Sequence, residues 1–142
     1  MTGYRTLHLD DIPTVRFDEG SNLPNWKPVR RTLGVEAFGT NAYVGEQPGD
    51  IVIERHDELP DGDELAHEEL YLVVGGRARF TVGDESFEVP SGGIVFLSDP
   101  ALVREAVALE PATVVFAVGA PVGAPFTPSE WEARFFAEGR TD

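Results

Sequence analysis

The sequence lacks cysteine altogether and has few basic residues, and both features exclude classes of function. Without cysteine there is no disulfide bond, no thiolate metal site and no cysteine nucleophile. The 25 acidic residues outnumber the 11 basic ones and give a net charge of -14. Binding to nucleic acid or to an anionic membrane depends on lysine and arginine facing phosphate groups. We therefore expect no nucleic-acid partner and no membrane partner.

Long apolar runs are absent as well. No stretch approaches the ~18 consecutive apolar residues that a membrane helix needs, and the first residues, 1–8, lack the apolar core of a secretion signal. A cytoplasmic location is the expectation that follows. The 142 residues, of which 42% are hydrophobic and 25% charged, match one soluble globular domain.

The chain does contain many short segments rich in β-branched and aromatic residues. Strands are predicted over residues 35–38, 42–44, 51–56, 70–74, 78–82, 86–89, 94–97, 102–109 and 113–118. Turn signals such as Asp61-Gly62-Asp63 separate them. Short, regularly spaced strands without a helical pattern between them predict an all-β antiparallel sandwich or barrel. Its central hairpin is predicted over residues 67–84, around Gly75-Gly76 and ending at Gly83-Asp84.

We divide the chain into an N-terminal arm and loop (1–34), a barrel (35–119) and a tail (120–142), all within one domain. Glycines and prolines interrupt the first segment around Trp26. A ring of that size is expected to anchor the loop by burial.

The tail predicts a helix that begins at Thr127-Pro128-Ser129-Glu130. Thr127 is the expected N-cap, Pro128 the first helical residue, and Glu130 completes a capping box. Trp131 and Phe135 lie one turn apart on one face, so both rings can be buried against the barrel or a partner chain. The helix is expected to end near Gly139.

Glu69 and Gly76 are separated by six residues, and Glu69 begins the tripeptide Glu-Leu-Tyr. Both features resemble the first sequence motif of the cupin superfamily. The resemblance covers roughly residues 35–119 and implies an antiparallel jelly-roll barrel. In metal-dependent cupins, three histidines and a glutamate bind one divalent ion inside the barrel. The resemblance implies a homodimer, because members of the family commonly dimerise and because exposed strand edges need to be covered.

The ligands of the first cupin motif are mostly missing. Its two histidines would fall within residues 62–65, where the chain has none, and His67 is off that register. A longer loop offers an alternative in which His56 is the first ligand and Glu58 replaces the second. Strand alternation lets these two side chains share a face. With Glu69 they would form a metal set for one divalent ion such as Zn, Fe, Mn or Ni.

The second cupin motif lacks its histidine too. Pro90-Ser91-Gly92 matches the Pro-x-Gly element literally, and it would place Val95 at the ligand position. The strand over 94–97 favours a different alignment, in which Asp99-Pro100-Ala101 replaces that element and Arg104 replaces the histidine. Arginine cannot coordinate a cation because it has no lone pair to offer. The usual four-ligand site is therefore broken.

Two interpretations of Glu69 stay open. It is either a metal ligand or an inward carboxylate paired with Arg104, because a buried charge needs a partner. His56 is a candidate ligand or proton carrier, or else a surface residue at a strand end. His67 shares strand parity with Glu69, and it either lines the pocket or is structural.

Further candidates surround these residues. Tyr43 and Tyr71 are expected in the wall of a ligand pocket. Arg77 and Arg79 share one strand face, which is either solvated or, together with Arg104, clamps an anionic ligand.

Three hypotheses about function follow, and all place one small organic molecule inside the barrel. The first is a metal-dependent enzyme of oxygenase or isomerase type. The second is a metal-free pocket in which Arg104 pairs with Glu69 or with an acidic group of the ligand, and His56 moves a proton. The third is a non-catalytic binding or sensing module. The sequence leaves open whether the chain is an enzyme, because one fold hosts many chemistries.

Overall fold

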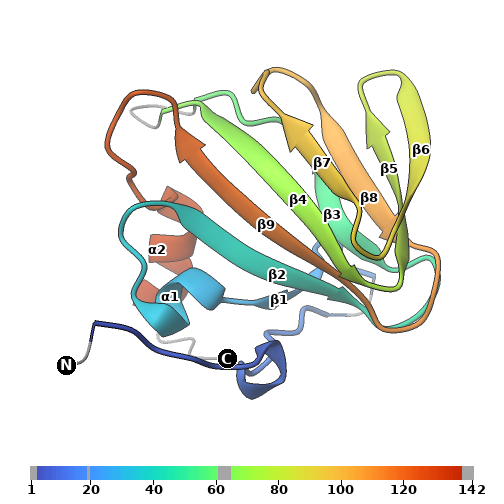
Figure 1. The fold of residues 1–142 in the computed structure, drawn as a ribbon, viewed down its shortest axis with the longest axis horizontal. Coiled ribbons are helices and arrows are strands. Elements are labelled where there is room, and N and C mark those ends of the chain that lie inside the picture. Colours follow the sequence, from blue (N-terminus) through green and yellow to red (C-terminus); the bar gives the residue numbers. More distant parts are fainter. Residues whose placement is uncertain (1–2, 19, 61–64, 139–142) are drawn as a thin grey trace.

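The computed structural model describes residues 3–18, 20–60 and 65–138, which form two antiparallel sheets packed face to face (Figure 1). The five-stranded sheet contains, in spatial order, β1 (Asn25–Lys27), β2 (Gly39–Gly45), β9 (Thr113–Pro121), β4 (His67–Gly75) and β7 (Ile94–Leu97). The four-stranded sheet contains β3 (Ile51–His56), β8 (Arg104–Ala108), β5 (Arg77–Val82) and β6 (Glu85–Pro90). The predicted all-β jelly roll is confirmed.

The main core lies between the two sheets. Alternate residues of each strand point inward, as in β8, where Arg104, Ala106 and Ala108 are buried and the residues between them are less so. Phe80 and Tyr71 pack together across the sheets with their ring centroids 5.6 Å apart. The inner face is therefore apolar at one end of the barrel and carries polar side chains at the end where β8 begins.

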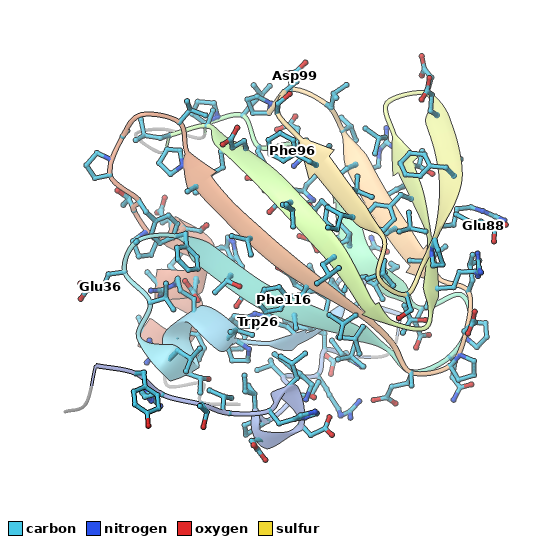
Figure 2. All side chains as sticks on the ribbon, in the orientation of Figure 1. Trp26, Glu36, Glu88, Phe96, Asp99 and Phe116 are labelled. Atoms are coloured by element: carbon cyan, nitrogen blue, oxygen red, sulfur yellow. The ribbon has the colours of Figure 1, made fainter. Side chains whose placement is uncertain are left out.

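The outer face of β5 carries arginines that point away from this core. Arg79 pairs with Glu88 on the neighbouring strand at 3.4 Å, and Arg77 pairs with Glu88 and Glu110. Figure 2 shows Glu88 pointing away from the barrel. Arg77 and Arg79 are thus on the solvated face, and the alternative that they clamp a ligand is wrong.

The predicted hairpin over residues 67–84 is wrong in its pairing. β4 pairs with β7 and β9, whereas β5 pairs with β6 and β8, so the chain crosses from one sheet to the other at Gly76. The true hairpin joins β5 to β6 through Gly83-Asp84. Glycine turns serve both kinds of connection, and local sequence does not distinguish them.

The N-terminal segment and the short helix α1 (Val29–Leu33) cover the outer face of the five-stranded sheet. Ile12 and Val29 pack with Ala42 of β2, and the short 3-10 helix η1 (Leu9–Asp11) lies beside them. The strand predicted over residues 35–38 is not formed. Val35 instead closes the end of α1, where its N–H donates to the Arg30 carbonyl and its own carbonyl accepts from the Arg30 guanidinium.

Helix α2 (Glu130–Ala137) packs on the edge of the five-stranded sheet through Trp26, which is 1% exposed and does anchor its segment by burial. The rings of Trp131 and Phe135 lie 5.0 and 5.3 Å from that of Trp26. Both contacts confirm the predicted shared face.

The start of α2 differs from its prediction. Ser129 rather than Thr127 is the N-cap, and its side chain makes no capping hydrogen bond, so the predicted capping box does not form. The predicted end at Gly139 and the predicted turn at 61–63 lie outside the described residues. Among the helices that the structure describes, none has the length and apolar character to cross a membrane.

The sheet crossing at Gly76 supplies a test of the fold. Gly76 has φ +73°, and a Cβ there would lie 2.4 Å from Thr113 Oγ1 and 2.8 Å from Thr113 Cα. We expect Gly76→Ala to lower the free energy of unfolding by about 2 to 4 kcal/mol, because backbone strain and a clash with a buried residue add together. Urea denaturation measures the loss.

Gly49→Ala is the matched control, because Gly49 has φ +93° but no atom within 4 Å of the added Cβ. Strain alone should lower its stability by about 1 to 2 kcal/mol. Equal losses in the two variants would contradict the clash at the sheet crossing.

Candidate functional site

A cavity of about 450 Å³ opens at the polar end of the barrel. Its walls come from β2, β3, β4 and β9, from the segment after β3 and from α2. Gly39 and Gly119 are cross-strand partners in this wall, and neither adds a side chain. A Cβ at Gly119 would lie 3.7 Å from the Glu69 carboxylate, so this glycine keeps space open beside it.

Three titratable side chains meet at the floor of the cavity. His56 ends β3, Glu58 follows two residues later, and Glu69 lies on the inner face of β4. His56 Nε2 lies 3.1 Å from Glu58 Oε1 and 3.9 Å from Glu69 Oε1. The structure thus brings together the three residues that the sequence proposed as one metal set.

Arg104 lies behind Glu69 rather than in the cavity wall. It begins β8, directly across from His56, and its side chain is fully buried. Its Nη1 donates to Glu69 Oε1 at 3.1 Å, and its Nε donates to the Leu102 carbonyl at 3.0 Å. The ion pair expected for Glu69 is present, and this placement favours it over direct contact between Arg104 and a ligand.

Burial and charge shift the titration of Glu69. Desolvation and the neighbouring Glu58 carboxylate raise the pKa of Glu69 from 4.5 to about 7. The Tyr71 hydroxyl, which donates to the same Oε1, and the positive charges of His56 and Arg104 oppose this rise but do not cancel it. A carboxyl that gains and loses a proton near neutral pH therefore faces the cavity.

His56 and Glu58 behave as a charged pair. Burial by itself lowers the pKa of His56. The hydrogen bonds to Glu58 and to the Glu54 carbonyl outweigh this effect and raise the pKa to about 9. Burial likewise opposes ionisation of Glu58, yet the hydrogen bond from His56 and nearby positive charge hold the pKa of Glu58 below its ordinary value. At neutral pH the pair is therefore imidazolium and carboxylate.

The remaining candidates from the sequence line the same cavity. His67 is on the inner face of β4, with its ring 5.8 Å from that of Phe126. Tyr43 projects from β2, and burial together with the carboxylates around it raises its pKa well above 10.0. Tyr71 lies deeper, 1% exposed, beside Glu69.

Sequence reasoning missed several polar residues of this cavity, among them Asn41 and Glu132. Asn41 lies on the inner face of β2, and Glu132 comes from α2. Asn41 falls between two predicted strands, and its inward direction follows only from the actual start of β2. Glu132 enters the site because α2 packs onto the barrel. The Trp131 and Phe135 pattern indicated such packing, but not that Glu132 would border the cavity.

The donors present fit a divalent metal ion. Ligand atoms of His56, Glu58 and Glu69 all lie within 4.8 Å of one another, and one imidazole with two carboxylates suits a hard or borderline ion. Arg104 Nη1 lies 3.9 Å from Glu58 Oε1 and closer still to Glu69, so a permanent positive charge borders the same space. That charge opposes cation binding.

Comparison with known proteins supports the fold. No family model and no curated protein matches the chain. Among solved structures, a cupin protein from Bacteroides fragilis is similar with a TM-score of 0.62 and 14% identity, over 91% of this chain and 93% of that one. A sugar phosphate isomerase of the cupin superfamily from Silicibacter pomeroyi has a TM-score of 0.63 and 14% identity, over 81% and 74%.

An uncharacterized conserved protein with a double-stranded β-helix domain, from Klebsiella pneumoniae, gives a TM-score of 0.60 at 20% identity, over 89% of this chain and 98% of that one. These likenesses show that the chain has the fold of a small cupin domain, which is also called a double-stranded β-helix. They leave its reaction and ligand to be argued from the site.

The shifted groups predict how stability depends on pH. Glu69 binds its proton more tightly in the folded than in the unfolded chain, so its contribution to stability declines as pH rises from 4.5 to about 7. His56 contributes stability that is complete below pH 6.5 and is lost as pH rises through about 9. We expect the free energy of unfolding, measured with urea, to decrease as the pH rises from 4.5 to about 9.

Glu69→Gln should flatten the lower part of this profile, and His56→Asn the upper part. His8→Asn, on the exposed N-terminal arm, is the control and should keep the wild-type slope. Parallel pH profiles for all four proteins would contradict the assigned shifts.

Proposed function

We propose that this chain is an enzyme that binds a small organic molecule in the barrel cavity and moves a proton on it without a metal, as an isomerase does. The observation that carries this proposal is the Glu69 carboxyl, which faces the cavity, is fixed by Arg104 and Tyr71, and has a pKa of about 7. A general base is most effective when its pKa lies near the working pH.

Arg104 and Tyr71 are positioning residues in this scheme. Both donate to Oε1 of Glu69, which leaves Oε2 as the oxygen free to exchange a proton with the substrate. Oε2 lies on the Gly119 side, where the missing side chain keeps space beside it. Two fixed donors on one oxygen hold the carboxyl in a single orientation, which proton transfer requires.

His56 supplies positive charge next to the base. Its imidazolium borders the cavity, with Nε2 3.9 Å from Glu69 Oε1. When Glu69 takes the proton from a hydroxyl-bearing carbon beside a carbonyl group, the electrons of that C–H bond form a C=C bond and the carbonyl oxygen becomes negative, which gives an enediolate. The His56 imidazolium donates its proton to that oxygen, and the neutral imidazole then takes the proton of the other hydroxyl group. Glu69 returns its own proton to the former carbonyl carbon, so a carbonyl forms at the neighbouring carbon. The sugar phosphate isomerase from Silicibacter pomeroyi, which has a similar fold, supports this choice of reaction.

Proton exchange in D₂O tests the proposal. A panel of aldoses, ketoses, hydroxy acids and oxo acids is incubated with the protein, and loss of the C–H signal beside the carbonyl is followed by ¹H NMR. We expect exchange that survives EDTA and rises with pH through about 7, as Glu69 ionises. Glu69→Gln should slow it by about 10² to 10⁴-fold, the usual contribution of a general base.

Glu88→Gln, on the outer face of β6, is the control and should exchange at the wild-type rate. Saturable ligand binding without any exchange would favour the non-catalytic binding module. Exchange that is unchanged in Glu69→Gln would refute the assigned base.

A metal-dependent enzyme is the second candidate, favoured by the convergence of His56, Glu58 and Glu69 within 4.8 Å. These residues would hold the ion, which would supply Lewis-acid chemistry to a bound carbonyl or hydroxyl group. Glu69 would then act as a ligand, with Arg104 and Tyr71 fixing it.

Metal content separates the two candidates. The protein is purified without chelator, analysed by elemental mass spectrometry and titrated calorimetrically with Zn²⁺ and Mn²⁺. The metal-free proposal expects less than stoichiometric metal and activity that resists EDTA. One ion per chain, with affinity falling about 100-fold in Glu69→Gln but not in Glu88→Gln, would establish the metal-dependent alternative.

A further inference from the structure

We propose that Asn41 and Glu132 form a second polar subsite, at the α2 side of the cavity, that binds hydroxyl groups, and that the ligand is a neutral polyhydroxylated molecule such as a sugar or sugar-derived polyol. This inference rests on the proposed function and names the substrate class for the same cavity.

Glu132 is the first part of the subsite. It is 5% exposed, although it carries a charge, and it lines the cavity from α2. Its Oε2 accepts a hydrogen bond from Arg30 Nε at 2.9 Å. Its Oε1 is buried and has no hydrogen-bond partner among the described residues. Buried oxygens in native proteins are nearly always satisfied, so this one requires a donor from outside the chain.

Asn41 is the second part. It lies on the inner face of β2, two residues before Tyr43, and its side chain hydrogen-bonds to the Tyr43 side chain. Its Oδ1 is buried and, within the described part of the chain, unpartnered. Two acceptors without donors therefore border one cavity, and a ligand that carries hydroxyl groups satisfies both.

The pairing of charges argues for a neutral ligand. Glu132 pairs with Arg30, Glu58 with His56, and Glu69 with Arg104, so these three carboxylates already have a cation. For the same reason neither Arg30 nor His56 is left over to hold a phosphate or a carboxylate. Glu54 and Asp57 also line the cavity, and their negative charge opposes an anionic ligand. The ligand must donate hydrogen bonds, but no net charge is required of it.

The indole of Trp131 adds an apolar surface suited to such a ligand. Trp131 is 45% exposed and borders the cavity next to Glu132. Its contact with Trp26 is edge-to-face, with centroids 5.0 Å apart, which leaves ring surface uncovered. A sugar ring presents C–H groups on one face and hydroxyl groups at its rim, and so matches an aromatic surface beside two acceptors.

Calorimetry and saturation-transfer NMR with matched probes test this proposal. The probes are D-glucose, D-xylose and glycerol as neutral compounds, glucose 6-phosphate and gluconate as anions, and glucosamine as a cation. We expect a neutral sugar to bind at least tenfold more tightly than its anionic and cationic counterparts. Asn41→Leu, which removes the acceptor, should weaken sugar binding by about tenfold, and Asn41→Asp, which keeps it, should retain binding.

Glu132→Gln should also weaken sugar binding by about tenfold, because a hydrogen bond to a charged acceptor is lost. Glu130→Gln is the matched control, since Glu130 lies on the same helix, is exposed and does not line the cavity. Circular dichroism confirms that each variant is folded. Absence of binding for every neutral probe, tighter binding of an anion or of the amine, or full affinity in folded Asn41→Leu would each overturn the inference.

The two proposals fail in different ways. Proton exchange on an anionic substrate, with no effect of Asn41→Leu, would refute this subsite and leave Glu69 as the base. Sugar binding that depends on Asn41 and Glu132, without any proton exchange, would support the subsite and refute the isomerase.

Discussion

Burial of the Glu69 carboxylate against the Arg104 guanidinium is the interaction on which the site depends. The two residues come from opposite sheets, β4 and β8, so their contact at 3.1 Å ties the sheets together at the polar end of the barrel. A fully buried arginine that lost this acceptor would be strongly destabilising, and the Glu69 carboxyl accepts from Nη1 whether or not it is protonated. The fold therefore accommodates Arg104 only while Glu69 stays in place, and catalytic geometry and barrel stability rest on the same pair.

Two further pairs of a carboxylate and a cation border the cavity. His56 with Glu58 and Arg30 with Glu132 each bring a carboxylate and a cation together at the cavity wall. Desolvation penalises isolated charges, whereas paired charges keep the cavity polar without a large net field. The resulting pocket has ample hydrogen-bonding capacity, and most of its carboxyl groups are already neutralised by the chain itself.

Much of this architecture could be predicted from the sequence, because strand alternation is a local property. It placed His67 and Glu69 on one face of β4, and it put His56 and Glu58 close enough to share a site. The pairing of β4 was mispredicted because a glycine turn that joins two strands of one sheet has the same local sequence as one that joins strands of different sheets. Arg30 and Glu132, 102 positions apart, meet only in three dimensions, and no spacing rule reveals such a pair.

That long separation has a consequence for how the molecule reaches its working form. All strands of the two sheets precede α2 in the sequence, whereas the Arg30–Glu132 wall of the cavity also requires α2. Helix α2 also contributes Trp131, and its neighbours in the Trp26 cluster hold it in place. The buried core between the sheets is built from residues of β3 to β9, so the barrel can hold its hydrophobic interior without α2, whereas the cavity wall cannot form without it.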